Sequence, residues 1–191
     1  MGVSRHRCPL RFAVGAGLLI LIGSPSPAVG GSPPGRDSLE AGVQILETAV
    51  PIAKRCEGTF SGLSRDLSGG RIKTRDQLAA RRQKVLNCFS SLTKRLHSAR
   101  PPLRAALQAN GLSEASSQDA VLKKGVVAGY AWLFTQHVKS FATELARASS
   151  SIRGAELGRP PTMAVYTFLS LQKHRTLLAK HLQSARREAL G

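Results

Sequence analysis

The chain has 191 residues, with 28 Lys and Arg against 11 Asp and Glu and a formal net charge of +17. Its length suffices for one domain with a real hydrophobic core. The sequence contains no Gly-rich phosphate loop, nucleophile elbow or cysteine-based haem attachment motif, so nothing local points to catalysis, nucleotide binding or a haem protein.

The first thirty residues have the three-part form of a secretory signal peptide. Three arginines precede an apolar run at 12–22, and small residues provide cleavage positions after Ala28 or Gly30. The run is too short for an ordinary membrane-spanning helix. We therefore predict a signal peptide at 1–30 and a secreted or periplasmic protein. Loss of the three arginines would lower the net charge from +17 to +14.

Residues 31–36 are rich in Gly, Pro and Ser and are predicted to be a disordered lead-in to a single helical domain at 37–191. Asp37 is the expected N-cap of a first helix, and Gly69 is expected to end it in the left-handed conformation. The apolar stripe of this helix comprises Leu39, Val43, Leu46, Val50, Ala53, Phe60, Leu63 and Leu67.

Pro51 lies inside this first helical pattern. A proline ring clashes with the preceding turn, so we expect Pro51 to kink or split the helix. An irregular all-α domain, in which Pro51 and Gly58 divide the first helix, is the alternative fold.

A second helix is predicted to begin at a capping box formed by Thr74 and Gln77 and to end at Pro101-Pro102. Its apolar residues are Leu78, Val85, Phe89, Leu92, Leu96 and Ala99. In an antiparallel hairpin turning near Ile72, Cys56 and Cys88 both lie sixteen residues from the turn. They should therefore reach the same height and form a disulfide, which the oxidising compartment favours; two separate buried thiols are the alternative.

The rest of the chain predicts a short helix and two long ones. Pro101-Pro102 can start the short helix, which Asn110-Gly111 ends, and a Ser-rich connector with Ser113 or Ser117 as a cap follows. The third pattern runs through Val127, Ala131, Phe134, Val138, Phe141, Leu145 and Ala148 and dissolves at Ser149–Ser151. After a loop at 152–159, Pro160-Pro161 opens a fourth pattern containing Val165, Phe168, Leu171, Leu178, Leu182, Ala185 and Ala189. No useful strand pattern appears, so we predict an all-α, up-down four-helix bundle with a short extra helix between helices two and three.

Positive charge is concentrated on helices two and four. In the predicted bundle these helices are diagonally opposite, so the basic surface would form two stripes that bind an anionic surface. The candidate residues are Arg81, Arg82, Lys84, Lys94, Arg95, Lys173, Arg175, Lys180, Arg186 and Arg187. The alternative is a solvated basic face in an Arg-rich protein. Nucleic acid is not expected as a partner, because no binding motif accompanies the charge.

Two other residue groups have more than one interpretation. His174 and His181 share a face of helix four, but they are about 10 Å apart and need a second helix to complete a metal site. We expect no metal ion or other cofactor. The aromatic residues of helix three could line a ligand pocket, although such residues are more often core; they are Tyr130, Trp132, Phe134 and Phe141. Helix four, apolar first and basic later, also has the pattern of a membrane-surface helix, but a C-terminal helix with a buried first half explains it better.

Together these features predict a binding or adaptor protein without catalytic activity. The first hypothesis is that the protein binds another envelope or secreted protein through a helix face or through the connector at 110–118. The second is electrostatic attachment to membrane headgroups or cell-wall polymer through helices two and four. The third is a carrier of a small apolar ligand. Binding that tolerates salt favours the first hypothesis, and binding that falls steeply with salt favours the second.

Overall fold

A computed structural model describes residues 32–159 and 164–191 of the chain. Residues Ser32–Gly191 belong to one compact unit. The predicted signal peptide and the Pro160-Pro161 helix start lie outside the described residues. Within them the protein is mostly helical and contains no strand, which confirms the all-α prediction.

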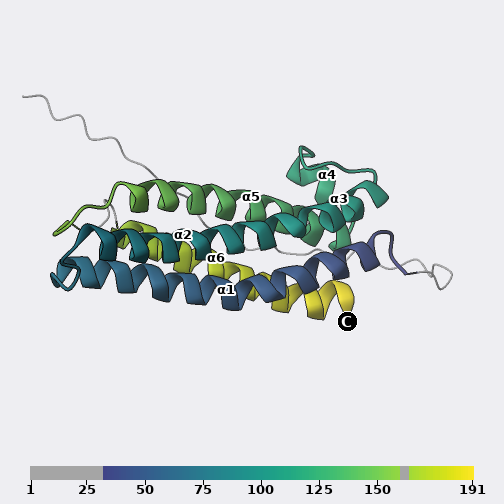
Figure 1. Ribbon diagram of the computed structural model, residues 1–191. Coiled ribbons are helices and arrows are strands. Elements are labelled where there is room, and N and C mark those ends of the chain that lie inside the picture. The colour runs from purple at the N-terminus through teal and green to yellow at the C-terminus, as the bar shows by residue number, and fades with distance from the viewer. Residues whose placement is uncertain (1–31, 160–163) are drawn as a thin grey trace, which may run out of the picture. The chain divides into compact units, whose positions relative to one another are not determined.

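Six α-helices and one final turn of π-helix make up this unit (Figure 1). They are α1 (Arg36–Ser68), α2 (Arg75–Ser98), α3 (Arg100–Ala109), α4 (Gln118–Leu122), α5 (Val126–Arg153), α6 (Ala164–Ala185) and η1 (Arg186–Leu190). Helices α1 and α5 each pack against α2, α3 and α6, whereas α2 and α6 make no direct contact in the described part of the chain. Helix α5 therefore has two long contact surfaces, here called seams: one with α2 and one with α6.

The beginning and end of α1 differ from the prediction. Gly35, with φ of 78°, occupies the N-cap position, and Asp37 lies in the first turn instead of capping it. Asp37 still lies where the helix dipole favours a negative charge. At the other end, Gly69 has φ of −84°, and Gly70 takes the left-handed conformation with φ of 59°. The capping box of α2 is confirmed, since Thr74 accepts a hydrogen bond from the Gln77 amide and the Gln77 side chain accepts one from Thr74.

Pro51 does not split α1, which runs without a break for 33 residues. Proline removes the hydrogen bond to the carbonyl of Glu47. Both Pro51 and Glu47 are exposed, so water can satisfy that carbonyl on the outer side of the helix. Gly58 is exposed as well, with no atom within 4 Å of the position where a Cβ would lie. Both expected breaks thus fall where α1 faces solvent, and the buried side of the helix stays continuous.

The predicted disulfide is confirmed. Cys56 of α1 and Cys88 of α2 are joined, with their Cα atoms 5.5 Å apart. Next to this bond the rings of Phe60 and Phe89 lie 6.2 Å apart, both almost wholly buried. The predicted register of the α1–α2 hairpin was therefore correct.

Pro101-Pro102 occupy the first turn of the short helix α3, as predicted, and α2 ends just before them at Ser98. Two other predictions for the later helices differ from the structure. Residues Ser149–Ser151 remain inside α5, where the Ser149 hydroxyl donates to the carbonyl of Leu145 at 2.7 Å. Val165, expected in the core, is 74% exposed. Ser117 caps α4, as the sequence suggested.

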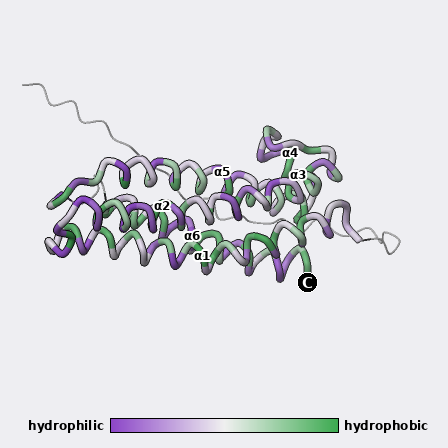
Figure 2. The backbone as a smooth tube through the Cα atoms, viewed as in Figure 1, coloured by the Kyte–Doolittle hydropathy of each residue, from purple (hydrophilic) through white to green (hydrophobic). Residues whose placement is uncertain are grey.

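Buried hydrophobic residues from every long helix belong to one core. The hydropathy colours of Figure 2 show hydrophobic residues recurring along these helices between hydrophilic ones. The two largest side chains that α5 contributes to the core, Phe134 and Phe141, are fully buried. Burial of apolar surface, which contributes about 25 cal/mol per Å2, is the main stabilising contribution in a domain of this kind.

Candidate functional site

The basic residues predicted on helix four are largely neutralised within the protein. Arg175 donates to Glu57 of α1 at 2.7 Å, in a pair that is mostly buried. Arg186 bridges two further carboxylates of α1, and Arg187 pairs with Glu188. The hydrogen bond between Arg186 and Glu47 lowers the pKa of Glu47 and raises the pKa of Arg186. Of the five α6-side candidates, only Lys173 and Lys180 have no carboxylate within ion-pairing distance in the described chain.

The basic residues of α2 have different partners. Arg81 pairs with Asp66 at 3.5 Å, and Arg82 donates to the carbonyl of Arg153 at the end of α5 at 2.7 Å. Arg95 donates to the hydroxyl of Thr48. Lys84 and Lys94 are exposed, and no described carboxylate lies within ion-pairing distance of either. Helix α2 thus keeps more uncompensated charge than α6.

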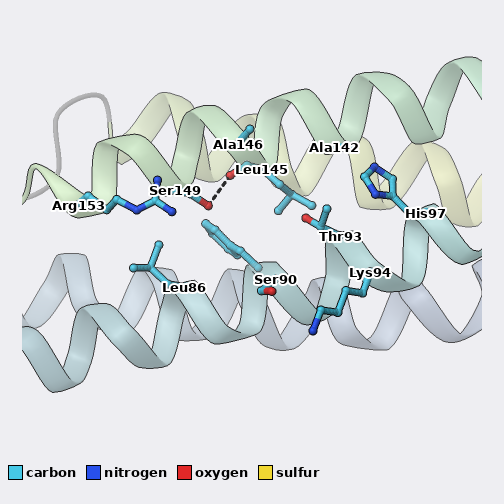
Figure 3. Close-up of a pocket in the computed structure, with 11 residues that line it drawn as sticks. Leu86, Ser90, Thr93, Lys94, His97, Ala142, Leu145, Ala146, Ser149 and Arg153 are labelled. Atoms are coloured by element: carbon cyan, nitrogen blue, oxygen red, sulfur yellow. Dashed lines mark hydrogen bonds between the residues drawn. The ribbon is translucent and has the colours of Figure 1, made fainter.

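A furrow of about 350 Å3 lies between α2 and α5 (Figure 3). Short side chains leave this space, since Ser90 and Thr93 of α2 and Ala142 and Ala146 of α5 are among the residues that line it. The remaining lining consists of Leu86, Phe89, Lys94, His97, Leu145, Ser149 and Arg153. Its floor is therefore apolar, while cations and hydroxyls border it, and none of the lining residues is acidic.

A second hollow of about 390 Å3 lies beside α3 and shares His97 with the furrow. It is lined by His97, Arg100, Pro101 and Arg104. Both arginines are held by Glu114 from the connector: Arg100 donates to one carboxylate oxygen at 3.0 Å, and Arg104 donates twice to the other. A single carboxylate thus fixes two guanidinium groups at the edge of one hollow.

Glu114 remains ionised in this arrangement. The hydrogen bond from Arg104 lowers the pKa of Glu114 most, burial opposes that effect, and the bond and charge of Arg100 add to it. Because one negative charge faces two positive ones, the hollow keeps a net positive charge. Each guanidinium also carries five N–H donors, more than Glu114 can accept.

The opposite side of α5 contains a cluster of three histidines. His137 of α5 lies between two histidines of α6, with ring centroids 5.4 Å from His174 and 5.9 Å from His181. Its Nε2 donates to the backbone carbonyl of His174 at 3.0 Å. Phe141 stacks on His174 at 5.1 Å. The second helix that a His174–His181 site requires is thus present, but no three His, Cys, Asp or Glu residues of the described chain are grouped so that they could hold a metal ion.

Burial keeps this cluster neutral. Desolvation, reinforced by the charge of His174, lowers the pKa of His137 to about 4. Desolvation is also the main cause that lowers the pKa values of His174 and His181. The charge of Glu144 opposes this effect at His174, while Lys173 and Lys180 each lower the pKa of the neighbouring histidine further. Among the described residues, the Nδ1 atoms of His174 and His181 have no hydrogen-bond partner.

The aromatic residues of α5 do not line either hollow. Phe134 and Phe141 belong to the core. The Tyr130 hydroxyl donates to Glu188, and burial is the main cause that raises its pKa to about 12. Trp132 donates to the carbonyl of Ser116, which helps to fasten the connector to α5.

Sequence reasoning missed the furrow and the two-arginine hollow. The signal for the furrow was the recurrence of short residues at helical spacing, Ser90 with Thr93 and Ala142 with Ala146, on two helices that each have an apolar stripe. No local pattern could connect Glu114 with α3, because that contact depends on the path of the connector.

Comparison of the chain with protein-family models, curated proteins and solved structures gives no match. Among the described residues, no helix has the length and apolar character needed to cross a membrane.

Proposed function

We propose that this protein is a secreted or periplasmic binding protein without catalytic activity, and that its partner is anionic and meets the side formed by α2, α3 and α5. The observation that carries this proposal is the difference between the two basic helices. In the described chain three of the five α6-side candidates pair with carboxylates, whereas of the five on α2 only Arg81 does, and the furrow and hollow beside α2 and α3 have no acidic lining residue. Net positive charge on one side steers an anionic partner toward that side.

We also propose that α1, α2, α5 and α6 form an up-down four-helix bundle, with α3 and α4 in the connection between its second and third long helices. The packing of α1 and α5 against both α2 and α6 supports this arrangement. The disulfide, together with the signal-like N-terminal sequence, supports export to an oxidising compartment.

The experiment is retention of the purified mature protein on anionic and on neutral lipid vesicles across a salt series. We expect retention on anionic vesicles only, decreasing steeply between about 50 and 300 mM salt as exposed charges are screened. The variant Lys84→Gln/Lys94→Gln should weaken retention, whereas the matched variant Lys173→Gln/Lys180→Gln should change it less. Equal retention on both vesicle types, or equal effects of both variants, would contradict the proposal.

A second candidate function is salt-tolerant binding of another protein through the start of α6. Val165, Tyr166 and Leu169 are 74%, 55% and 56% exposed there, which is unusual for three large apolar residues within one turn and a half. Binding that persists in high salt and is lost in Tyr166→Ser/Leu169→Ser would favour this function.

A further inference from the structure

We propose that the furrow and the adjoining hollow form one binding site for a single-chain amphiphilic anion. The alkyl chain would lie between α2 and α5, and the anionic head would lie against Arg100 and Arg104. This inference rests on the proposed function, because it names the ligand class for the same basic side of the protein. His97 lines both hollows, so they lie side by side, and the proposal is that one ligand spans them.

The furrow suits an unbranched alkyl chain. Leu86, Phe89 and Leu145 provide apolar lining, and the short side chains beside them leave this surface uncovered. From Leu86 to His97 the furrow follows α2 for three turns, about 16 Å at 1.5 Å per residue. A volume of about 350 Å3 lies near the lower end of the range for small-ligand sites, about 300–1,000 Å3.

The hollow suits the head group. Glu114 holds Arg100 and Arg104 in position before any ligand arrives, so little side-chain entropy is lost when an anion binds. Planar guanidinium groups bind carboxylate and phosphate oxygens with two parallel hydrogen bonds. His97 lies at the junction, where its ring can contact either the head or the first carbons of the chain.

Charge and size decide among occupants. The absence of any acid among the lining residues of both hollows, with Lys94 and Arg153 bordering the furrow, disfavours a cationic or zwitterionic amphiphile. A single alkyl chain can cover the floor itself.

The experiment uses the disulfide-bonded mature protein and dodecyl phosphate below its micellar concentration, followed by two-dimensional NMR and by calorimetry. Dodecyl maltoside tests the chain without the charge, and inorganic phosphate tests the charge without the chain. We expect dodecyl phosphate to shift the amide signals of residues 86–104 and 142–153 and to bind at least about tenfold more tightly than either control. Shortening the chain to octyl phosphate should weaken binding by about tenfold or more, because four methylenes leave the apolar floor.

Two variants and a matched control locate the site. Ala146→Phe places a large ring over the furrow at an exposed position and should weaken binding of dodecyl phosphate by about tenfold. Arg104→Gln removes one head contact and should weaken it by about fivefold to tenfold, while phosphate-free dodecyl maltoside is unaffected. Lys173→Gln removes one exposed charge on α6, outside both hollows, and should leave binding unchanged.

Five results would overturn the inference. Equal affinity for dodecyl phosphate and inorganic phosphate would mean an anion site alone, and equal affinity for dodecyl maltoside would mean an apolar site alone. Signal shifts centred on residues 165–169 would place the chain at the start of α6 instead. Binding of an acidic amphipathic peptide to the furrow, without binding of dodecyl phosphate, would make the occupant a protein. If vesicle retention keeps its salt dependence while dodecyl phosphate does not bind, this inference fails and the proposed function stands.

Discussion

Helix α5 packs against two neighbours in opposite ways. Toward α2 it presents Ala142 and Ala146 opposite Ser90 and Thr93, and a furrow remains between the helices. Toward α6 it presents His137 and Phe141, whose rings contact His174. The first seam is therefore open and bordered by cations, and the second is filled by rings.

The difference teaches that side-chain volume decides where a helical protein of this size leaves room for a ligand. Both seams involve the same helix, α5, and in each seam both helices have apolar residues at helical spacing. Large rings exclude water from the α5–α6 seam and neutralise its histidines, whereas short side chains leave the α2–α5 seam accessible. We therefore propose that binding takes place on the α2 side of α5, whose α6 side contributes to stability.

The largest effect on the free energy of unfolding is expected from removing a large ring from the seam between α5 and α6. Phe141 is fully buried and contacts two of the three clustered histidines. The change Phe141→Ala should lower the free energy of unfolding by about 3–5 kcal/mol, because it removes apolar contacts and leaves a cavity. Urea unfolding of the disulfide-bonded protein measures it. Leu86→Ala, at the half-buried edge of the furrow, should cost much less, and an equal cost for the two variants would show that the seams are equally packed.

The next effect concerns how α2 is held. On its α1 side it is fixed by the Cys56–Cys88 bond, which closes a loop of 32 residues. The double change Cys56→Ala/Cys88→Ala should lower the free energy of unfolding by about 3–4 kcal/mol in the chain-entropy model. Thermal unfolding with and without reductant gives the measurement. Reductant should destabilise the natural protein and leave the double variant unchanged.

Much of the fold could be predicted from the sequence, and the reasons for success and failure are local. Cys56 and Cys88 were paired correctly because equal distance from a turn is a linear property of a hairpin. Val165 was misplaced because a helical stripe shows which residues share a face, without showing where the neighbouring helix begins to cover that face. Pro51 was given too much weight because its exposure in α1 is decided by packing.

The sites were harder to predict than the helices. The ten basic residues were recognised as charges, but their partners lie far away in sequence: Arg175 pairs with Glu57 across 118 residues. Pairing of this kind removes charge from α6 and leaves it on α2, and no local pattern reports it. The histidine cluster was not predicted: the sequence placed His174 and His181 on one face of a helix, but no local pattern joined His137 of α5 to them.

The filled seam should also respond to acid. The pKa of His137 is about 4 in the folded protein, below the ordinary value of 6.5. The unfolded chain therefore binds protons first, so the stabilising contribution is complete above about pH 6.5 and is lost as the pH falls toward 4. Between pH 7 and pH 5 the loss from His137 should be about 2 kcal/mol. His174 and His181 act in the same direction, because burial lowers their pKa values too.

Urea unfolding at the two pH values measures this loss in the natural protein and in His137→Gln. The variant should lose distinctly less stability over the interval, since glutamine does not titrate and can still donate to the His174 carbonyl. An unchanged pH dependence would mean that other groups cause it. Dodecyl phosphate affinity, measured with the same variant at pH 7, should stay unchanged because His137 lies on the far seam.

The smallest effect compares one substitution at two positions on α5. Ala146 is exposed and lines the furrow, whereas Ala148 is 1% exposed and packs in the core. Ala146→Leu should change the free energy of unfolding by no more than about 0.5 kcal/mol, because the open furrow has room for the larger side chain. Ala148→Leu should cost about 1–3 kcal/mol, because it overpacks a full core. Both residues lie within the same helix and the exchange is identical, so helix propensity cancels in the comparison and the difference in unfolding midpoint reports local space alone. A cost at Ala146 as large as that at Ala148 would mean that the furrow is closed in solution, and with it the site for the alkyl chain.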